Sequence, residues 1–287
     1  MKRKIILILG DTHAGSQYGL THPETELHKE TQDGRTEKVH PELSEIQKFL
    51  FYNIYRPGLQ EVMKFAGQDE VVVIHNGDIT QGVKYDVSPI ASQILIAVTN
   101  LSEILKYPNI KRLRLMKGTI SHSLGDESDS DLLVTEILSR TFPEIDIKTN
   151  YHGEYLIKDV DTLIDISHHG PSKGIRKWLE GNQFRFYMRD ILLRKSLRKK
   201  RLPDVISRAH THGRLTEFLE LENHPCWGFI TPPMQFPSGY VRQVTRSIDE
   251  VEMGMLMLEV IYHGPKRKSI FPYWITKRLD ITTKEIL

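Results

Sequence analysis

Short apolar runs alternate with longer amphipathic stretches in the first half of the chain. Three runs are continuous, β-branched and of strand length, which is typical of strands buried on both faces. They cover residues 5–9, 71–74 and 113–116. Apolar residues between and after them recur with helical spacing, and Pro57 and Ser88-Pro89 are predicted to start helices. The helical stretches cover residues 43–50, 57–66, 88–105 and 132–138.

Strand patterns dominate the rest of the chain. A hairpin is predicted at 155–167, a short strand at 205–207, and further β-rich segments follow residue 214. Residues 182–201 form a basic helical stretch, and the polar segment 21–40 is predicted to be a long loop. We therefore expect one α/β domain over residues 1–287. It would carry a basic helical insertion around 171–203 and a β-rich C-terminal part at 214–287.

Composition narrows the class of protein only slightly. The 287 residues include 39 lysines and arginines and 37 acidic residues, so the net charge of +2 does not by itself mark a nucleic-acid-binding chain. The single cysteine, Cys226, excludes an internal disulfide and is expected to be a buried apolar residue. No run approaches the ~20 apolar residues of a membrane span, and the first apolar run is too short for a signal peptide. We expect a cytoplasmic protein with no membrane partner.

Side chains that commonly bind metals follow five of the predicted strands. In open α/β sheets, ligands bind in the crevice beyond the carboxyl ends of the strands, so these residues could meet in one cleft. They are Asp11, His13, Asp78, Thr119, His122, His168, His169, His210 and His212.

Two of these groups have the same spacing. Asp11-Thr12-His13 and His210-Thr211-His212 are i, i+2 pairs, whose side chains would point the same way if the backbone is extended. Carboxylates and neutral imidazoles suit zinc, manganese or iron. Two such ions about 3.5–4 Å apart can share a hydroxide and clamp a phosphoryl group.

The ordered set resembles the calcineurin-like metallophosphoesterases. Their pattern of Asp-x-His, Gly-Asp, Gly-Asn-His, His and Gly-His-x-His is similar to the segments here, and the resemblance spans about residues 5–215. The matching segments are Gly10-Asp11-Thr12-His13, Gly77-Asp78, Gly118 to His122, His168-His169-Gly170 and His210-Thr211-His212. The resemblance implies a four-layer α/β/β/α sandwich with two mixed β-sheets.

The resemblance also implies a ligand set. It assigns Asp11, His13 and His212 to a first metal and makes Asp78 the bridging carboxylate. His210 and one histidine of the 168/169 pair would hold the second metal. We favour His168, which directly follows the predicted strand, and keep His169 as the alternative.

Two positions depart from the family pattern. Ala209 replaces a glycine, which is a small change, but Thr119 stands where the family has an asparagine. A threonine hydroxyl is a poorer neutral ligand than an amide oxygen. His122, three residues later, would either replace the missing ligand or protonate the leaving oxygen. We assign Asp78 and His122 to catalysis and Thr119 to the metal set.

The predicted activity is hydrolysis of a phosphomonoester or phosphodiester with two divalent ions, manganese being favoured over iron or zinc. One alternative is a nuclease that binds DNA or RNA through the basic segment 185–201. A second alternative is a non-catalytic binding module on the same fold. The pattern does not specify the natural substrate or the oligomeric state.

Overall fold

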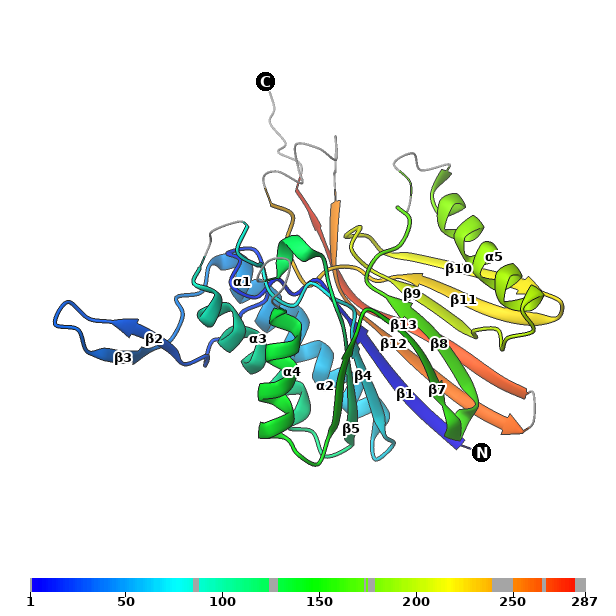
Figure 1. Cartoon of the computed structure of the whole chain (residues 1–287), viewed down its shortest axis with the longest axis horizontal. Helices are drawn as coiled ribbons and strands as arrows, with labels where there is room; N and C mark the ends of the chain where they lie inside the picture. Colours follow the sequence, from blue (N-terminus) through cyan, green and yellow to red (C-terminus); the bar gives the residue numbers. More distant parts are fainter. Residues whose placement is uncertain are drawn as a thin grey trace, which may run out of the picture.

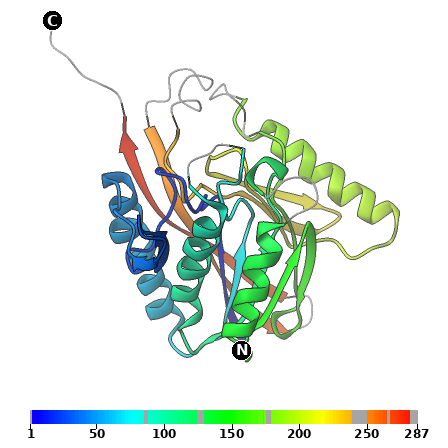
Figure 2. The same cartoon turned by 60° about the vertical axis from the view of Figure 1, so that its left-hand side comes forward.

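A computed structural model describes residues 2–84, 88–123, 129–172, 174, 179–238, 250–264 and 267–281. Two β-sheets face each other, and helices cover the outer face of each sheet (Figure 1). Figure 2 shows the helix of residues 182–197 on the side opposite the other helices. The predicted four-layer α/β/β/α sandwich with two mixed sheets is therefore confirmed.

The first sheet is built around β1 (Lys2–Leu9), which pairs in parallel with one neighbour and antiparallel with the other. Ile5, Leu7 and Leu9 face the helices, while Ile6 and Ile8 face the second sheet. Because successive side chains alternate between faces, an uninterrupted apolar run is what a strand buried on both sides requires. The sheet order is β13 (Arg267–Asp280), β12 (Glu250–Gly264), β1, β4 (Val71–His75), β5 (Ile110–Met116) and β6 (Asp146–Asn150).

The helices of the first layer pack on the outer face of this sheet. Their bounds are α1 (Glu45–Phe49), the π-helical segment η1 (Leu50–Tyr55), α2 (Arg56–Ala66), α3 (Ile90–Leu105) and α4 (Ser130–Thr141). The predicted helix of residues 57–66 is confirmed as α2, but the π-helical segment that joins it to α1 without a break was not predicted. Pro57 has no amide hydrogen to donate, and it lies in the first turn of α2, directly after the wider turns of η1.

The second sheet has its own outer helix. Its order is β10 (Leu215–Leu221), β11 (His224–Ile230), β9 (Val205–Arg208), β8 (Thr162–Ser167) and β7 (His152–Ile157). Helix α5 (Asn182–Leu197) packs Phe184, Met188 and Leu192 against this sheet, where they meet Cys226. Cys226 is buried as expected, and burial raises the pKa of its thiol.

Two further strand regions were not predicted. The segment expected to be a loop contains a hairpin of β2 (Leu27–Glu30) and β3 (Thr36–Val39), which projects from the body of the protein (Figure 1). Strand β6 is largely polar because it lies at a sheet edge, so it lacked the apolar signal of a central strand. Short 3₁₀ turns occur at Ile120–His122 and Lys158–Val160. No helix in the described ranges is both long enough and apolar enough to cross a bilayer.

Replacing Leu7 with alanine should strongly destabilise the protein. Leu7 is a fully buried residue of β1 whose side chain packs against the helices. Shortening that side chain to alanine leaves a cavity and also removes apolar contacts. We expect a loss of about 2–5 kcal/mol in the free energy of unfolding, measured by urea denaturation. Leu197→Ala is the control, because Leu197 is 83% exposed and should change stability by less than about 0.5 kcal/mol. Equal effects would contradict the assigned core.

Candidate metal centre

The loops that follow β1, β4, β5, β8 and β9 meet at one end of the two sheets. Four overlapping groups of three side chains each have their ligand atoms within 4.8 Å of one another. The groups are Asp11, His13 and His212; His13, Asp78 and His122; Asp11, Asp78 and His168; and His168, His169 and His210. Residues from both sheets, up to 201 positions apart in sequence, therefore share one site.

Five of these residues have an unusual backbone conformation. Asp11, His13, Asp78, His210 and His212 have φ between +43° and +66°. They account for five of the nine described non-glycine residues with positive φ. Such angles are rare for residues with a side chain and cluster at functional sites. The expectation that the two i, i+2 pairs lie in extended backbone was wrong. Both members of each pair have left-handed backbone, and their side chains reach the site from tight turns.

Backbone hydrogen bonds hold the turns after β1 and β4 against each other. The amide of Asp11 donates to Gly77 O at 2.9 Å, and the amide of His13 donates to Asp78 O at 3.0 Å. On the second sheet, the amide of Ala209 donates to His168 O at 2.9 Å. These bonds replace sheet pairing where the strands end, so the left-handed turns are supported on both sides.

The Asp78 carboxylate lies at the centre of the site. The Thr119 amide donates to its Oδ1 at 2.6 Å, and His168 Nε2 lies 3.0 Å from its Oδ2. His13 Nε2 and His122 Nε2 lie 3.9 and 4.0 Å from that same Oδ2. Burial acts to raise the pKa of Asp78, but the surrounding imidazoles, above all His168, outweigh it and hold the pKa well below its usual range. Asp78 is therefore an ionised acceptor within reach of several imidazoles.

His168 is oriented by a hydrogen bond from its second ring nitrogen. Its Nδ1 donates to Asn76 O at 2.7 Å, which turns Nε2 toward Asp78. Such a bond is the usual way in which a ligand imidazole is fixed. Burial acts to lower the pKa of His168, but Asp78 outweighs it and raises the pKa to about 9. His169 is exposed, whereas His168 is buried.

Asp11 and His13 are buried with unsatisfied polar atoms. Both carboxylate oxygens of Asp11 and both ring nitrogens of His13 lack a hydrogen-bond partner. Burial lowers the pKa of His13 to about 3, so its imidazole stays neutral at pH 7. His212 Nε2 lies 3.3 Å from Asp11 Oδ1. Buried polar groups normally have partners, and a buried acid and a neutral imidazole without partners fit a divalent cation.

Thr119 and His122 occupy different sides of Asp78. Thr119 Oγ1 lies 3.5 Å from His168 Nε2 and 3.3 Å from His210 Nδ1. The His122 ring instead lies 4.5 Å from the His13 ring, and its Nδ1 donates to Gln81 O at 2.8 Å. Thr119 thus lies where the family pattern has its asparagine, and His122 lies on the opposite side of the carboxylate.

Several supporting residues were not singled out from the sequence. Asn76 orients His168, Gln81 orients His122, and Asp131 accepts a hydrogen bond from the Gly118 amide at 3.2 Å. The first two act through backbone carbonyls, which leave no residue-type signal. His75 is also buried, with its Nε2 3.0 Å from Oγ1 of Thr12, the residue between Asp11 and His13.

Three polar or proline-rich segments near the metal-ligand residues in sequence differ in their placement. In the segment 16–40, the end near residue 20 packs beside the His13 turn, whereas the β2–β3 hairpin extends outward (Figure 1). Residues 232–237 are buried, and the Met234 amide donates to Gly10 O. Asp129 caps α4, while Asp126 and Glu127 lie outside the described residues.

The strand order, the four layers and the order of the clustered residues decide the fold. They agree with the fold that the resemblance to the calcineurin-like metallophosphoesterases implies. No family model matches the sequence of this chain, and no curated protein sequence matches it.

Three solved structures are similar to this chain over most of its length but differ widely from it in sequence. A conserved uncharacterized protein from Streptococcus pneumoniae TIGR4, described as a predicted phosphoesterase, is 10% identical with a TM-score of 0.35, over 95% of this chain and 99% of that one. Vps29 of Chaetomium thermophilum is 8% identical with a TM-score of 0.34, over 97% and 98%. The Thermus thermophilus sulfate thiohydrolase SoxB, in complex with glycerol, is 11% identical with a TM-score of 0.36, over 95% and 56%. Likenesses at this level carry no conclusion about activity.

Replacing Gly77 with alanine should disrupt metal binding. A Cβ at Gly77 would lie 2.4–2.7 Å from atoms of the His168 side chain, so the imidazole would have to move. Gly34→Ala is the matched control, because Gly34 also has positive φ (+78°, against +90° for Gly77) but has nothing within 4 Å of the added Cβ. We expect bound metal, measured by elemental analysis, to fall only in Gly77→Ala. Equal metal content in the two variants would contradict the assigned contact.

Metal binding should release protons at pH 7. Because Asp78 raises the pKa of His168 to about 9, that imidazole is protonated in the ion-free protein, and an entering cation must displace the proton. Affinity should therefore weaken as pH falls below 9, by up to about tenfold per unit for one proton. His13, with a pKa of about 3, contributes nothing to this change near neutrality. Calorimetry in buffers of different ionisation enthalpy measures the release, and buffer-independent heats would refute it.

Proposed function

We propose that this chain is a metal-dependent hydrolase of phosphate esters. The observation that carries the proposal is the group of buried, unsatisfied acid and imidazole atoms around Asp78. Desolvating such groups without partners costs several kcal/mol, which a structural role would not require. Two divalent cations, manganese, iron or zinc, would compensate that cost.

The side chains divide into two sets on either side of Asp78. Asp11, His13 and His212 would hold one ion, and His168 and His210 the other, with Asp78 shared between them. When bound, such a pair of ions supplies an activated water and stabilises the charge that develops on a phosphoryl group. Exposed His210 and half-buried Thr119 border the solvent side, from which an ester would enter.

His122 is the proposed proton donor to the leaving oxygen. Its Nδ1 donates to Gln81 O, which fixes the ring with Nε2 4.0 Å from Asp78 Oδ2. The ring lies beside His13, whereas Thr119, which stands in place of the asparagine, lies beside His168 and His210. Of the two roles considered for His122, this position favours proton transfer.

The geometry gives less support to the nuclease alternative. Several cations of the 185–201 segment form ion pairs, including Arg185 with Glu217 and Lys195 with Glu154. Arg201 pairs with Asp161, just before β8, whereas His168 follows the other end of that strand. At about 3.3 Å per residue, the two ends lie roughly 20 Å apart. The C-terminal end of the basic segment 185–201 thus lies away from the centre.

Turnover of aryl phosphodiesters and phosphomonoesters by metal-loaded protein tests the proposal. We expect His122→Asn to keep both ions, measured by elemental analysis, and to lower kcat by about 10²–10⁴-fold, because only proton transfer is lost. His28→Asn is the control, since His28 is an exposed residue of β2.

The same assay separates the rival functions. Wild-type protein that binds two ions yet hydrolyses neither ester would favour a non-catalytic binding module. Loss of a metal ion in His122→Asn would instead make His122 a ligand and contradict its assignment as the proton donor.

A further inference from the structure

We infer that His169 is a metal ligand that replaces the amide missing at position 119. The inference rests on the metal centre of the proposed function and concerns its second position, formed by His168 and His210. Both histidines of the 168/169 pair would then bind the same ion, where the family pattern expects one histidine and an asparagine.

Thr119 offers no amide oxygen to the second ion, where an asparagine side chain would supply one. Its Oγ1 lies 3.3–3.5 Å from the ring nitrogens of His210 and His168, close to them but on a side chain shorter than asparagine. Its amide is already engaged, donating to Asp78 Oδ1. A neutral hydroxyl is a weak ligand for zinc, manganese or iron, so this position needs another donor.

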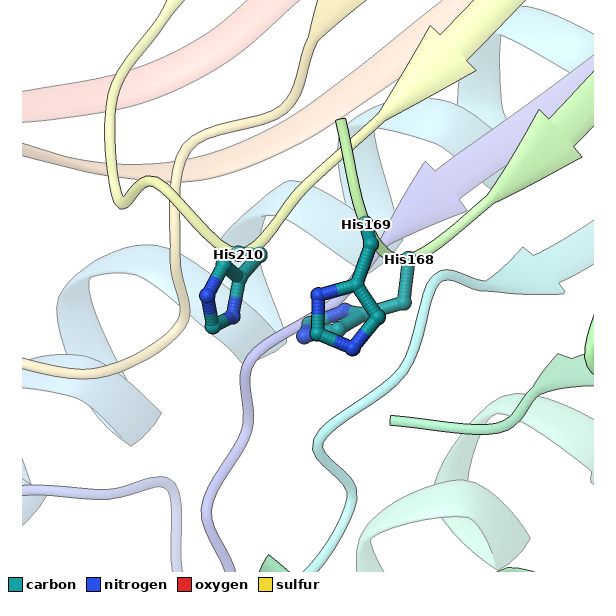
Figure 3. Close-up of side chains that lie close together, drawn as sticks. All are labelled: His168, His169 and His210. Atoms are coloured by element: carbon teal, nitrogen blue, oxygen red, sulfur yellow. The ribbon is translucent and has the colours of Figure 1, made fainter. Parts of the chain in front are cut away.

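His169 supplies a donor beside His168 and His210. Its ring centroid lies 4.6 Å from that of His210 and 5.0 Å from that of His168. One nitrogen from each of the three rings lies within 4.8 Å of the others. Figure 3 shows the three rings converging from two loops, one after β8 and one after β9.

The local backbone explains why two adjacent histidines reach the same point. In a continuous strand, neighbouring side chains point to opposite faces. Strand β8 ends at Ser167, and Ser167 Oγ donates to His169 O at 3.2 Å, so the chain turns at this pair. The Ala209 amide bonds to His168 O and keeps the His210 loop beside this turn.

The replacement changes the chemistry of the second position. Three imidazoles and one shared carboxylate make a nitrogen-rich set, which favours zinc or iron(II) over manganese. An asparagine oxygen in place of His169 would make the set more favourable to manganese. The expectation that manganese is preferred therefore changes for this position.

Calorimetric titration of ion-free protein with zinc, paired with elemental analysis, tests the inference. We expect wild type to bind two ions, and His169→Ala to keep the first and bind the second more than about tenfold more weakly, since even an outer partner of a ligand is worth that much. His28→Ala is the matched control and should titrate like wild type.

Restoring the amide gives the decisive comparison. Thr119→Asn in the His169→Ala background should recover the second ion and shift its preference from zinc toward manganese, because an amide oxygen now binds the ion. This readout is independent of activity and would not follow from a purely structural role of His169.

The outcomes separate this inference from the proposed function. If wild type binds two ions and His169→Ala binds both with unchanged affinity, His169 is not a ligand, and the proposed function stands. If wild type binds no ion, both the proposed function and this inference fall.

Discussion

The centre depends on burying the Asp78 carboxylate among imidazoles at the point where two sheets meet. A buried anion is costly unless positive charge or hydrogen bonds compensate it. Here the Thr119 amide and the His168 ring supply part of that compensation. His13 approaches the same oxygen to 3.9 Å, and neither of its ring nitrogens has a hydrogen-bond partner, which suits two side chains that would hold one cation.

The sandwich makes this burial possible. β1 and β4 are apolar on both faces, so they lie between two layers of core and deliver their carboxyl ends to the interior rather than to solvent. The turns that follow adopt left-handed backbone at Asp11 and Asp78, and hydrogen bonds between these turns offset that strain. The packed core thus supports the strained turns at the ends of the strands. These turns hold the ligand-type side chains in place before an ion binds.

The two sheets contribute different parts of the centre. The first sheet provides the acids and His13, and the second provides His168, His169, His210 and His212. The departure from the family pattern at Thr119 falls on the first sheet, while the imidazole available to offset it lies on the second. Two facing sheets allow a ligand from one sheet to replace a ligand from the other. A metal ligand needs only to lie at the right place in space, whatever its position in the sequence.

Much of the fold and of the candidate site could be predicted from local sequence. Continuous apolar runs identified the buried strands, and polar residues directly after them identified the edge where a site forms. The polar edge strand β6 and the β2–β3 hairpin were missed, because neither buries enough apolar surface to leave a pattern.

The sequence pattern thus predicted an α/β domain and a set of side chains able to bind metal, and the family resemblance implied the layered sandwich. Tertiary structure alone decided which of them share a point in space. It placed His122 beside His13 and His169 beside His210, and it replaced extended pairs with left-handed turns. The physical reason is that the residue type fixes which ligand atom each position offers. The distances between ligand atoms instead depend on how the two sheets and their connecting turns pack.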